Sequence, residues 1–186
     1  DLSESGTLIS NFNNHNLLRT EINGVYLWEI PRSNRWTISL AGKSGWISNT
    51  KADSFFHFFA GGIPGLKGYP FYALEGTNMV IGEVGLRIPI FREKHIPVGW
   101  FTLQNVTVGF LGQIGDAWNK NLTKFDSKKS TGLEFRLAGN SFYNYPTSIG
   151  LEIHRGLDKF EMDIGDGKPI TYGGENRFYL SVLFGF

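Results

Sequence analysis

The sequence lacks three things that would each have indicated a particular kind of protein. It has no cysteine among its 186 residues, which excludes disulfides, thiol catalysis and thiolate metal sites. It has no apolar run approaching the roughly 18 residues that a spanning helix needs, so no transmembrane helix is expected. Residues Asp1 to Glu4 carry neither the basic nor the apolar region of a signal peptide, so an exported form would have its signal outside this sequence.

Charge is also scarce, and its two signs are balanced. The 18 Lys and Arg against 17 Asp and Glu leave a net charge of +1, so no nucleic-acid partner is expected. Only 19% of the residues are charged, compared with about 25% in ordinary soluble domains. With 24 glycines and 15% aromatic residues, the chain is too apolar to be disordered, and residues 1–186 are predicted to form one domain.

Helical periodicity is nearly absent, whereas apolar and polar side chains alternate along much of the chain. The C-terminal segment is the clearest case, because Phe178, Leu180, Val182, Phe184 and Phe186 lie on one face of a strand. The same alternation predicts strands within residues 21–30, 35–43, 78–90, 100–115, 131–138 and 148–154. A weaker segment, Thr7 to Asn13, would bring the total to about eight strands.

The predicted connections alternate in length. Turn residues occupy 31–34, 91–99 and 141–146, whereas the connections at 49–77, 117–129 and 156–175 are long. Neighbouring strands are therefore predicted to be antiparallel. Short turns at one end, long loops at the other and strands of about 9–11 residues are typical of bacterial outer-membrane barrels.

A soluble antiparallel sandwich or a lipocalin-like barrel is the alternative, because its strands alternate in the same way. The charges favour the membrane barrel, because they are few and form balanced sets suited to a polar lumen: Arg19 with Glu21, Glu83 with Arg87, Glu134 with Arg136, and Glu152 with His154. Aromatic residues near the strand ends suit girdles at the lipid–water boundary. We therefore predict an all-β fold, an antiparallel transmembrane β-barrel. The sheet must close, because hydrocarbon offers no hydrogen-bond partners to the backbone N–H and C=O groups of an open edge.

One segment carries a family resemblance. Residues 58–70 read Phe-Phe-Ala-Gly-Gly-Ile-Pro-Gly-Leu-Lys-Gly-Tyr-Pro, and the strand at 82–89 ends Leu-Arg-Ile-Pro. This resembles the surface-antigen barrel of the outer-membrane assembly-factor superfamily, which contains BamA, TamA and the two-partner-secretion transporters. Family barrels have about sixteen strands, so the resemblance is to the C-terminal half. The residues that match the family's loop motif are Gly61, Gly62, Leu66, Lys67, Gly68 and Tyr69.

The resemblance implies that the long loop at 49–77 folds back into the lumen, with its basic tip held by acidic residues on the two following strands. Here the loop cation is Lys67, and the family's acidic positions hold Gly85 and Gln113. Glu83 lies on the same inward face as Gly85 and is expected to substitute for the missing acid. The expected lumen partners of the loop are Glu83, Arg87 and Gln113.

The sequence shows no enzyme or cofactor signature. The four histidines, at 15, 57, 95 and 154, lack metal-ligand spacing, so no metal and no cofactor is predicted. No nucleophile motif is present, and no catalytic residue is assigned. Enzymatic activity in the lumen or at the surface is therefore the third-ranked hypothesis.

The first hypothesis is a protein of the Gram-negative outer membrane that acts in protein insertion or translocation. The resemblance implies a lateral seam at the C-terminal strand, which also resembles an outer-membrane targeting signal. Expected partners are outer-membrane lipids and lipopolysaccharide, the outer-membrane assembly machinery and unidentified client proteins. Two copies joined as a homodimer would complete about sixteen strands. The second hypothesis is a closed structural or anchoring barrel without transport activity.

Overall fold

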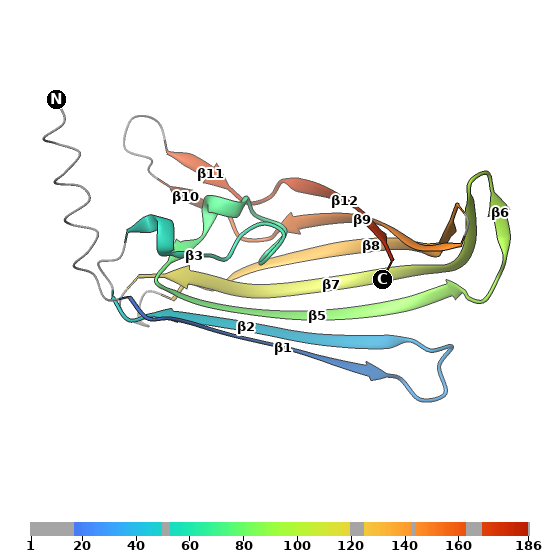
Figure 1. Cartoon of the computed structure of the whole chain (residues 1–186). Helices are drawn as coiled ribbons and strands as arrows, with labels where there is room; N and C mark the ends of the chain where they lie inside the picture. Colours follow the sequence, from blue (N-terminus) through green and yellow to red (C-terminus); the bar gives the residue numbers. More distant parts are fainter. Residues whose placement is uncertain (1–16, 50–52, 120–124, 143, 163–168, 186) are drawn as a thin grey trace, which may run out of the picture.

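The computed structural model describes residues 17–49, 53–119, 125–142, 144–162 and 169–185. The chain is all-β, with one large antiparallel sheet in the order β1-β2-β5-β7-β8-β9-β12 and β6 attached to β7 (Figure 1). Each long strand therefore pairs with the long strand that follows it in the sequence. The antiparallel arrangement predicted from the alternating connections is confirmed.

Most of the long strands coincide with the segments that alternate in sequence. The sheet consists of β1 (Arg19–Glu29), β2 (Thr37–Ile47), β5 (Asn78–Phe91), β6 (Ile96–Val98), β7 (Phe101–Trp118), β8 (Lys128–Ser141), β9 (Tyr145–Gly156) and β12 (Asn176–Phe184). Two small two-stranded sheets lie outside it: one pairs β3 (Phe58–Phe59) with β4 (Glu75–Gly76), and the other pairs β10 (Phe160–Met162) with β11 (Ile170–Tyr172). The predicted turn at 91–99 contains β6, which pairs with β7 and extends that hairpin.

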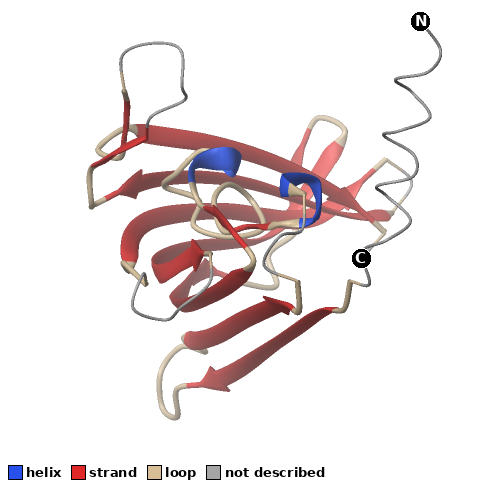
Figure 2. Ribbon diagram, turned by 90° about the vertical axis from the view of Figure 1, so that its left-hand side faces the viewer, coloured by secondary structure: helices blue, strands red, loops and turns tan. Residues whose placement is uncertain are grey.

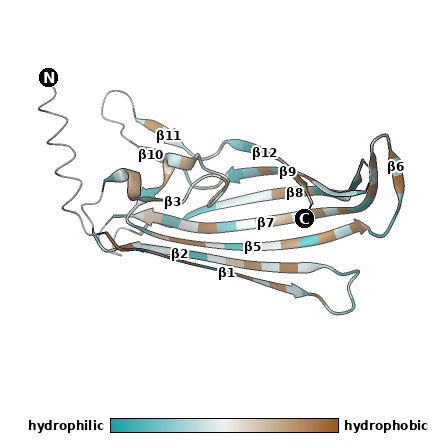
Figure 3. Ribbon diagram, viewed as in Figure 1, coloured by the Kyte–Doolittle hydropathy of each residue, from teal (hydrophilic) through white to brown (hydrophobic). Residues whose placement is uncertain are grey.

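The two faces of the sheet differ sharply in polarity. Along β8 the inward residues, such as Glu134, are buried, whereas Leu133 and Phe135 on the other face are exposed. The neighbouring strands alternate in the same way, and hydrophilic and hydrophobic bands follow one another along the ribbon (Figure 3). The convex face is therefore apolar, whereas the concave face carries charged side chains and, beneath the loop, apolar residues of the core.

The sheet curves but does not close among the described residues. β1 and β12 are its two edges, and no pairing joins them (Figure 2). Six antiparallel steps lead from β1 to β12, so the two edge strands run in the same direction. The predicted strand Thr7 to Asn13 and the terminal Phe186 lie outside the described residues. Within the described part, no helix is long and apolar enough to cross a membrane.

The buried apolar core lies between the concave face and the loop at 49–77. The loop contributes Phe58, Leu66 and Tyr69, which pack against strand residues such as Ile47 and Met79. Phe58, Leu66 and Tyr69 are each at most 1% exposed. This core fixes the loop on the sheet and so positions the polar site described next.

Candidate functional site

The candidate site is the contact between the loop tip and the concave face of β7, β8, β9 and β12. The loop begins with the 3-10 turn η1 (Ser54–Phe56), where the Asp53 side chain accepts a hydrogen bond from the Phe55 amide at 2.9 Å. A second 3-10 turn, η2 (Phe71–Ala73), leads the chain back to the sheet. Between the two turns lies the segment that contains the family-like motif.

Short backbone hydrogen bonds give the tip its shape. The Leu66 amide donates to the Ala60 carbonyl at 2.7 Å, and the Gly62 amide donates to the Tyr69 carbonyl at 3.0 Å. Gly62 has φ of 70°, a left-handed conformation that favours glycine. Gly68 approaches the sheet so closely that a Cβ atom there would lie 2.5 Å from the Gly156 nitrogen. Glycine at these two positions lets the tip turn and touch the sheet backbone.

Gln113 on β7 is the central polar contact of the tip. Its Oε1 accepts from the Lys67 backbone amide and from the Ser130 hydroxyl, both at 2.9 Å. Its Nε2 donates to the Gly65 carbonyl at 3.0 Å and to Glu83 Oε2 at 2.7 Å. A carboxylate at this position would have no N–H to donate to Gly65. The glutamine therefore satisfies both a donor and an acceptor of the loop backbone.

The Lys67 side chain makes the one ionic contact of the tip with the sheet in the described structure. Its Nζ lies 2.5 Å from Glu152 Oε2 on β9, and the two side chains are 19% and 13% exposed. His154 Nε2 lies 2.9 Å from the same oxygen, and the His154 ring is fully buried. His154, two residues further along β9, therefore makes a second contact to the carboxylate that holds Lys67.

The partner of Lys67 differs from the expected one. Glu83 contacts the loop only through Gln113, and Arg87 does not contact it. Arg87 Nε instead donates to Glu134 Oε2 at 2.7 Å, and Glu134 is also paired with Arg136. The reason is geometric: the tip lies over β7 and β8, so the lysine side chain reaches onward to β9 and not back to β5.

Two tyrosines complete the site. The Tyr179 hydroxyl on β12 donates to the Lys67 carbonyl at 2.7 Å, which ties the tip to the C-terminal strand. The Tyr69 hydroxyl lies 2.9 Å from the Lys129 carbonyl and accepts from the Asp158 amide at 3.0 Å. Burial raises the pKa of the Tyr69 phenol above its ordinary value. The neutral phenol is the form that suits this enclosed position.

The predicted seam strand has its apolar side chains on the convex face. Phe178, Leu180, Val182 and Phe184 are between 46% and 73% exposed. On the concave side of the same strand, Arg177 and Tyr179 stand opposite His154 and Glu152 of β9. The free edge of β12 therefore presents unpaired backbone between an apolar and a polar face.

Sequence reasoning missed Glu152, Ser130 and Tyr179 as contacts of the loop. All three lie on the inward parity of their strands, a signal available from the sequence. Which inward residue meets the tip depends on where the loop crosses the sheet. Three of the four predicted charge pairs are present, whereas Glu83 and Arg87 have different partners.

The assembled site is built to hold a loop. The Lys67, Glu152 and His154 side chains are connected through the Glu152 carboxylate, and Gln113 joins them through the Lys67 backbone amide. Comparison of the chain with protein-family models, curated proteins and solved structures found no match.

Proposed function

We propose that this chain forms the wall of an outer-membrane β-barrel resembling the assembly-factor superfamily, and that it acts in protein insertion or translocation. The observation that carries the proposal is the polarity of the sheet: its convex face is apolar and exposed, whereas the charged side chains Glu83, Arg87, Glu134 and Glu152 lie on its concave face. A soluble barrel would have its apolar face inward. The loop seat on the concave face and the motif at 58–70 agree with the resemblance to that superfamily.

The convex apolar surface is extensive. Its side chains that are at least 37% exposed on β5, β7, β8, β9 and β12 are Val80, Val84, Phe110, Ile114, Leu133, Phe135, Leu151, Ile153, Phe178, Leu180, Val182 and Phe184. Soluble monomers rarely expose contiguous apolar patches above a few hundred Å². Contact with lipid acyl chains removes the cost of exposing this face to water. Exposed Trp28, Trp36 and Tyr145 near the hairpin end suit an interfacial girdle.

Closure in hydrocarbon requires additional strands. Unpaired N–H and C=O groups on the edges of β1 and β12 would each cost several kcal/mol in lipid, on the order of the loss of a hydrogen bond in an apolar medium. Because β1 and β12 run in the same direction, an entirely antiparallel closure needs an odd number of added strands. Two copies of the seven-stranded path alone would meet through parallel pairs, whereas one further strand per copy makes both junctions antiparallel, with about sixteen strands.

The open edges suggest how the barrel would act on a client. A strand of an incoming protein can pair with the free edge of β1 or β12, in the manner of β-augmentation. All eleven residues of β1 are exposed, and among the described strands β1 pairs with β2 alone. The mechanism is therefore strand templating without covalent chemistry.

The firmly held loop favours a second candidate, a closed anchoring barrel without transport. Lys67, Gln113 and Tyr179 fix the tip on the inner face, where it occupies the space that a solute would cross. Conductance across planar bilayers separates the two candidates. Sizeable current steps support a wide shared pore, and a silent membrane with a monomeric native mass supports the anchoring barrel.

The orientation itself is tested by an arginine on the convex face. Val84 lies on the interior strand β5 and is 50% exposed. In phosphatidylcholine vesicles, Val84→Arg should lower the free energy of unfolding by about 2–4 kcal/mol, because the side chain enters hydrocarbon. The control Val84→Ala keeps the position apolar and should cost less. A change within about 0.5 kcal/mol for Val84→Arg, as expected for an exposed site in water, would contradict the proposal.

A further inference from the structure

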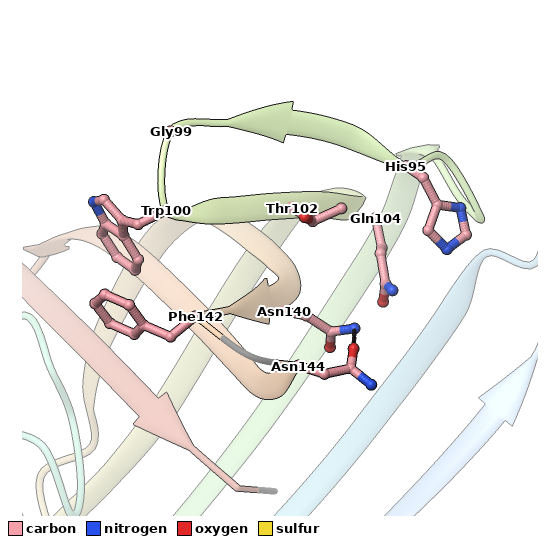
Figure 4. Close-up of a pocket in the computed structure, with 8 residues that line it drawn as sticks. All are labelled: His95, Gly99, Trp100, Thr102, Gln104, Asn140, Phe142 and Asn144. Atoms are coloured by element: carbon pink, nitrogen blue, oxygen red, sulfur yellow. Dashed lines mark hydrogen bonds between the residues drawn. The ribbon is translucent and has the colours of Figure 1, made fainter.

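An open pocket of about 610 Å³ lies at the hairpin end of the sheet, remote from the loop seat (Figure 4). It is lined by residues of the β6–β7 hairpin and, from the opposite side, by Asn140, Phe142 and Asn144. The mechanism proposed above makes no use of it. Its lining combines an aromatic wall with uncharged polar side chains.

The aromatic wall consists of Trp100 and Phe142. Their rings are stacked with centroids 5.2 Å apart and planes inclined by 17°, and the residues are 54% and 63% exposed. The Phe142 amide donates to the Trp100 carbonyl at 2.9 Å, so the backbone holds the two residues together. A paired aromatic surface of this kind offers contact area to the C–H groups of a ligand.

The polar part of the lining has unused hydrogen-bonding capacity. The Asn140 amide donates to Asn144 Oδ1 at 2.6 Å, and within the described structure the Asn140 side-chain carbonyl and the Asn144 amino group have no hydrogen-bond partner. The side chains of Thr102, Gln104 and His95 have no hydrogen-bond partner within the described structure. Convergent polar groups beside an apolar wall are typical of a ligand site.

The charge of the lining defines the class of ligand. No Lys, Arg, Asp or Glu lines the pocket and His95 is the one titratable side chain in its lining, so no permanent charge there compensates a phosphate, a carboxylate or an amine. Amide and hydroxyl groups both donate and accept, which matches a ligand rich in hydroxyl groups. The lining therefore suits an uncharged polar ligand with apolar C–H faces.

The backbone around the pocket is held in an unusual conformation. Phe142 and Asn144 have φ of 38° and 78°, although both carry side chains. Residues other than glycine adopt this region rarely, and such outliers are concentrated at binding sites. At these two positions the conformation places the ring against Trp100 and the amide against Asn140.

We propose that this pocket binds a neutral saccharide, with sugar C–H groups against the Trp100–Phe142 pair and hydroxyl groups bonded to the amides. The inference does not depend on the proposed function of the barrel. The ligand class follows from the uncharged, amide-rich lining and the adjoining aromatic pair. A sugar ring also fits the dimensions of an open pocket of this volume.

The test titrates the full chain with maltotriose and with tri-N-acetylchitotriose while tryptophan fluorescence is recorded. The protein is held in a dimethylamine oxide detergent, because the headgroup of a maltoside detergent would compete. At least one trisaccharide should change the fluorescence in a saturable way. Asn144→Gly, which tolerates the positive φ and removes the amide, should weaken binding by about tenfold. Asn140→Ala should weaken it similarly, whereas the distant control Asn23→Ala should leave it unchanged.

Three outcomes would overturn the proposal. The first is no saturable change with either trisaccharide by fluorescence and by calorimetry. The second is binding that survives both asparagine substitutions in variants whose thermal unfolding matches that of the native chain. The third is tighter binding of glucose 6-phosphate than of glucose, which would assign recognition to charge. Aromatic residues that served only as an interfacial girdle would give the first outcome.

Discussion

Replacing Lys67 by alanine tests whether the loop is anchored through its tip. The substitution removes the contact of Nζ with Glu152 but leaves the backbone hydrogen bonds to Gln113 and from Tyr179. Glu152 then keeps only His154 as a side-chain hydrogen-bond partner, at 2.9 Å. The loss is therefore that of one cation from a largely buried carboxylate.

The expected magnitude follows from the burial of the pair. Removing one partner of a fully buried ion pair costs about 3–5 kcal/mol. Lys67 and Glu152 are 19% and 13% exposed, and His154 remains, so we expect Lys67→Ala to lower the free energy of unfolding by about 2–3 kcal/mol. The matched control is Lys43→Ala, because the Lys43–Glu21 pair spans 3.0 Å with both side chains 28–33% exposed. Lys43→Ala should lower the free energy of unfolding by less than about 1 kcal/mol.

The assay is urea unfolding in phosphatidylcholine vesicles, followed by tryptophan fluorescence and by heat-modifiable gel migration. A double-mutant cycle with Glu152→Gln isolates the pair: the Lys67→Ala loss should fall by at least about 1 kcal/mol once the carboxylate is gone. Equal losses for Lys67→Ala and Lys43→Ala, with no coupling to Glu152, would refute the anchoring of the loop through this contact.

Further substitutions probe the rest of the seat. Gly156→Ala should destabilise the chain by about 1–3 kcal/mol in urea unfolding, because a Cβ would lie 2.7 Å from the Tyr69 ring, whereas Gly24→Ala, with nothing within 4 Å, should show no such clash. Tyr69→Phe should cost about 1–3 kcal/mol near neutral pH. Burial raises the pKa of the Tyr69 phenol in the folded state. The contribution of Tyr69 to the free energy of unfolding is therefore complete below about pH 10 and is lost as the pH rises through the folded-state pKa. A penalty for Tyr69→Phe that does not shrink above about pH 10 would contradict this reasoning. Arg87→Ala should lower the unfolding midpoint, because Glu134 is 2% exposed and keeps a single cation, and an unchanged midpoint would show that the pair contributes nothing.

The local pattern of the sequence determined the strands and their faces. Alternation at Val80, Val84 and their neighbours identified the convex face before any contact was known, because side chains in a strand point to opposite sides with a period of two. The family resemblance of residues 58–70 implied a loop with a tip at Lys67. These features depend only on residues close together in the chain.

The tertiary structure decided which of the inward residues meet. Lys67 reaches Glu152, 85 residues later, because sheet curvature and strand register carry β9 beneath the tip. Gln113 forms hydrogen bonds to the loop backbone through both its side-chain oxygen and its side-chain nitrogen, and it can do so only because the tip crosses β7. The parallel direction of the two edge strands and the pocket between separate hairpins likewise arise from the pairing of distant segments, which a period of two cannot specify.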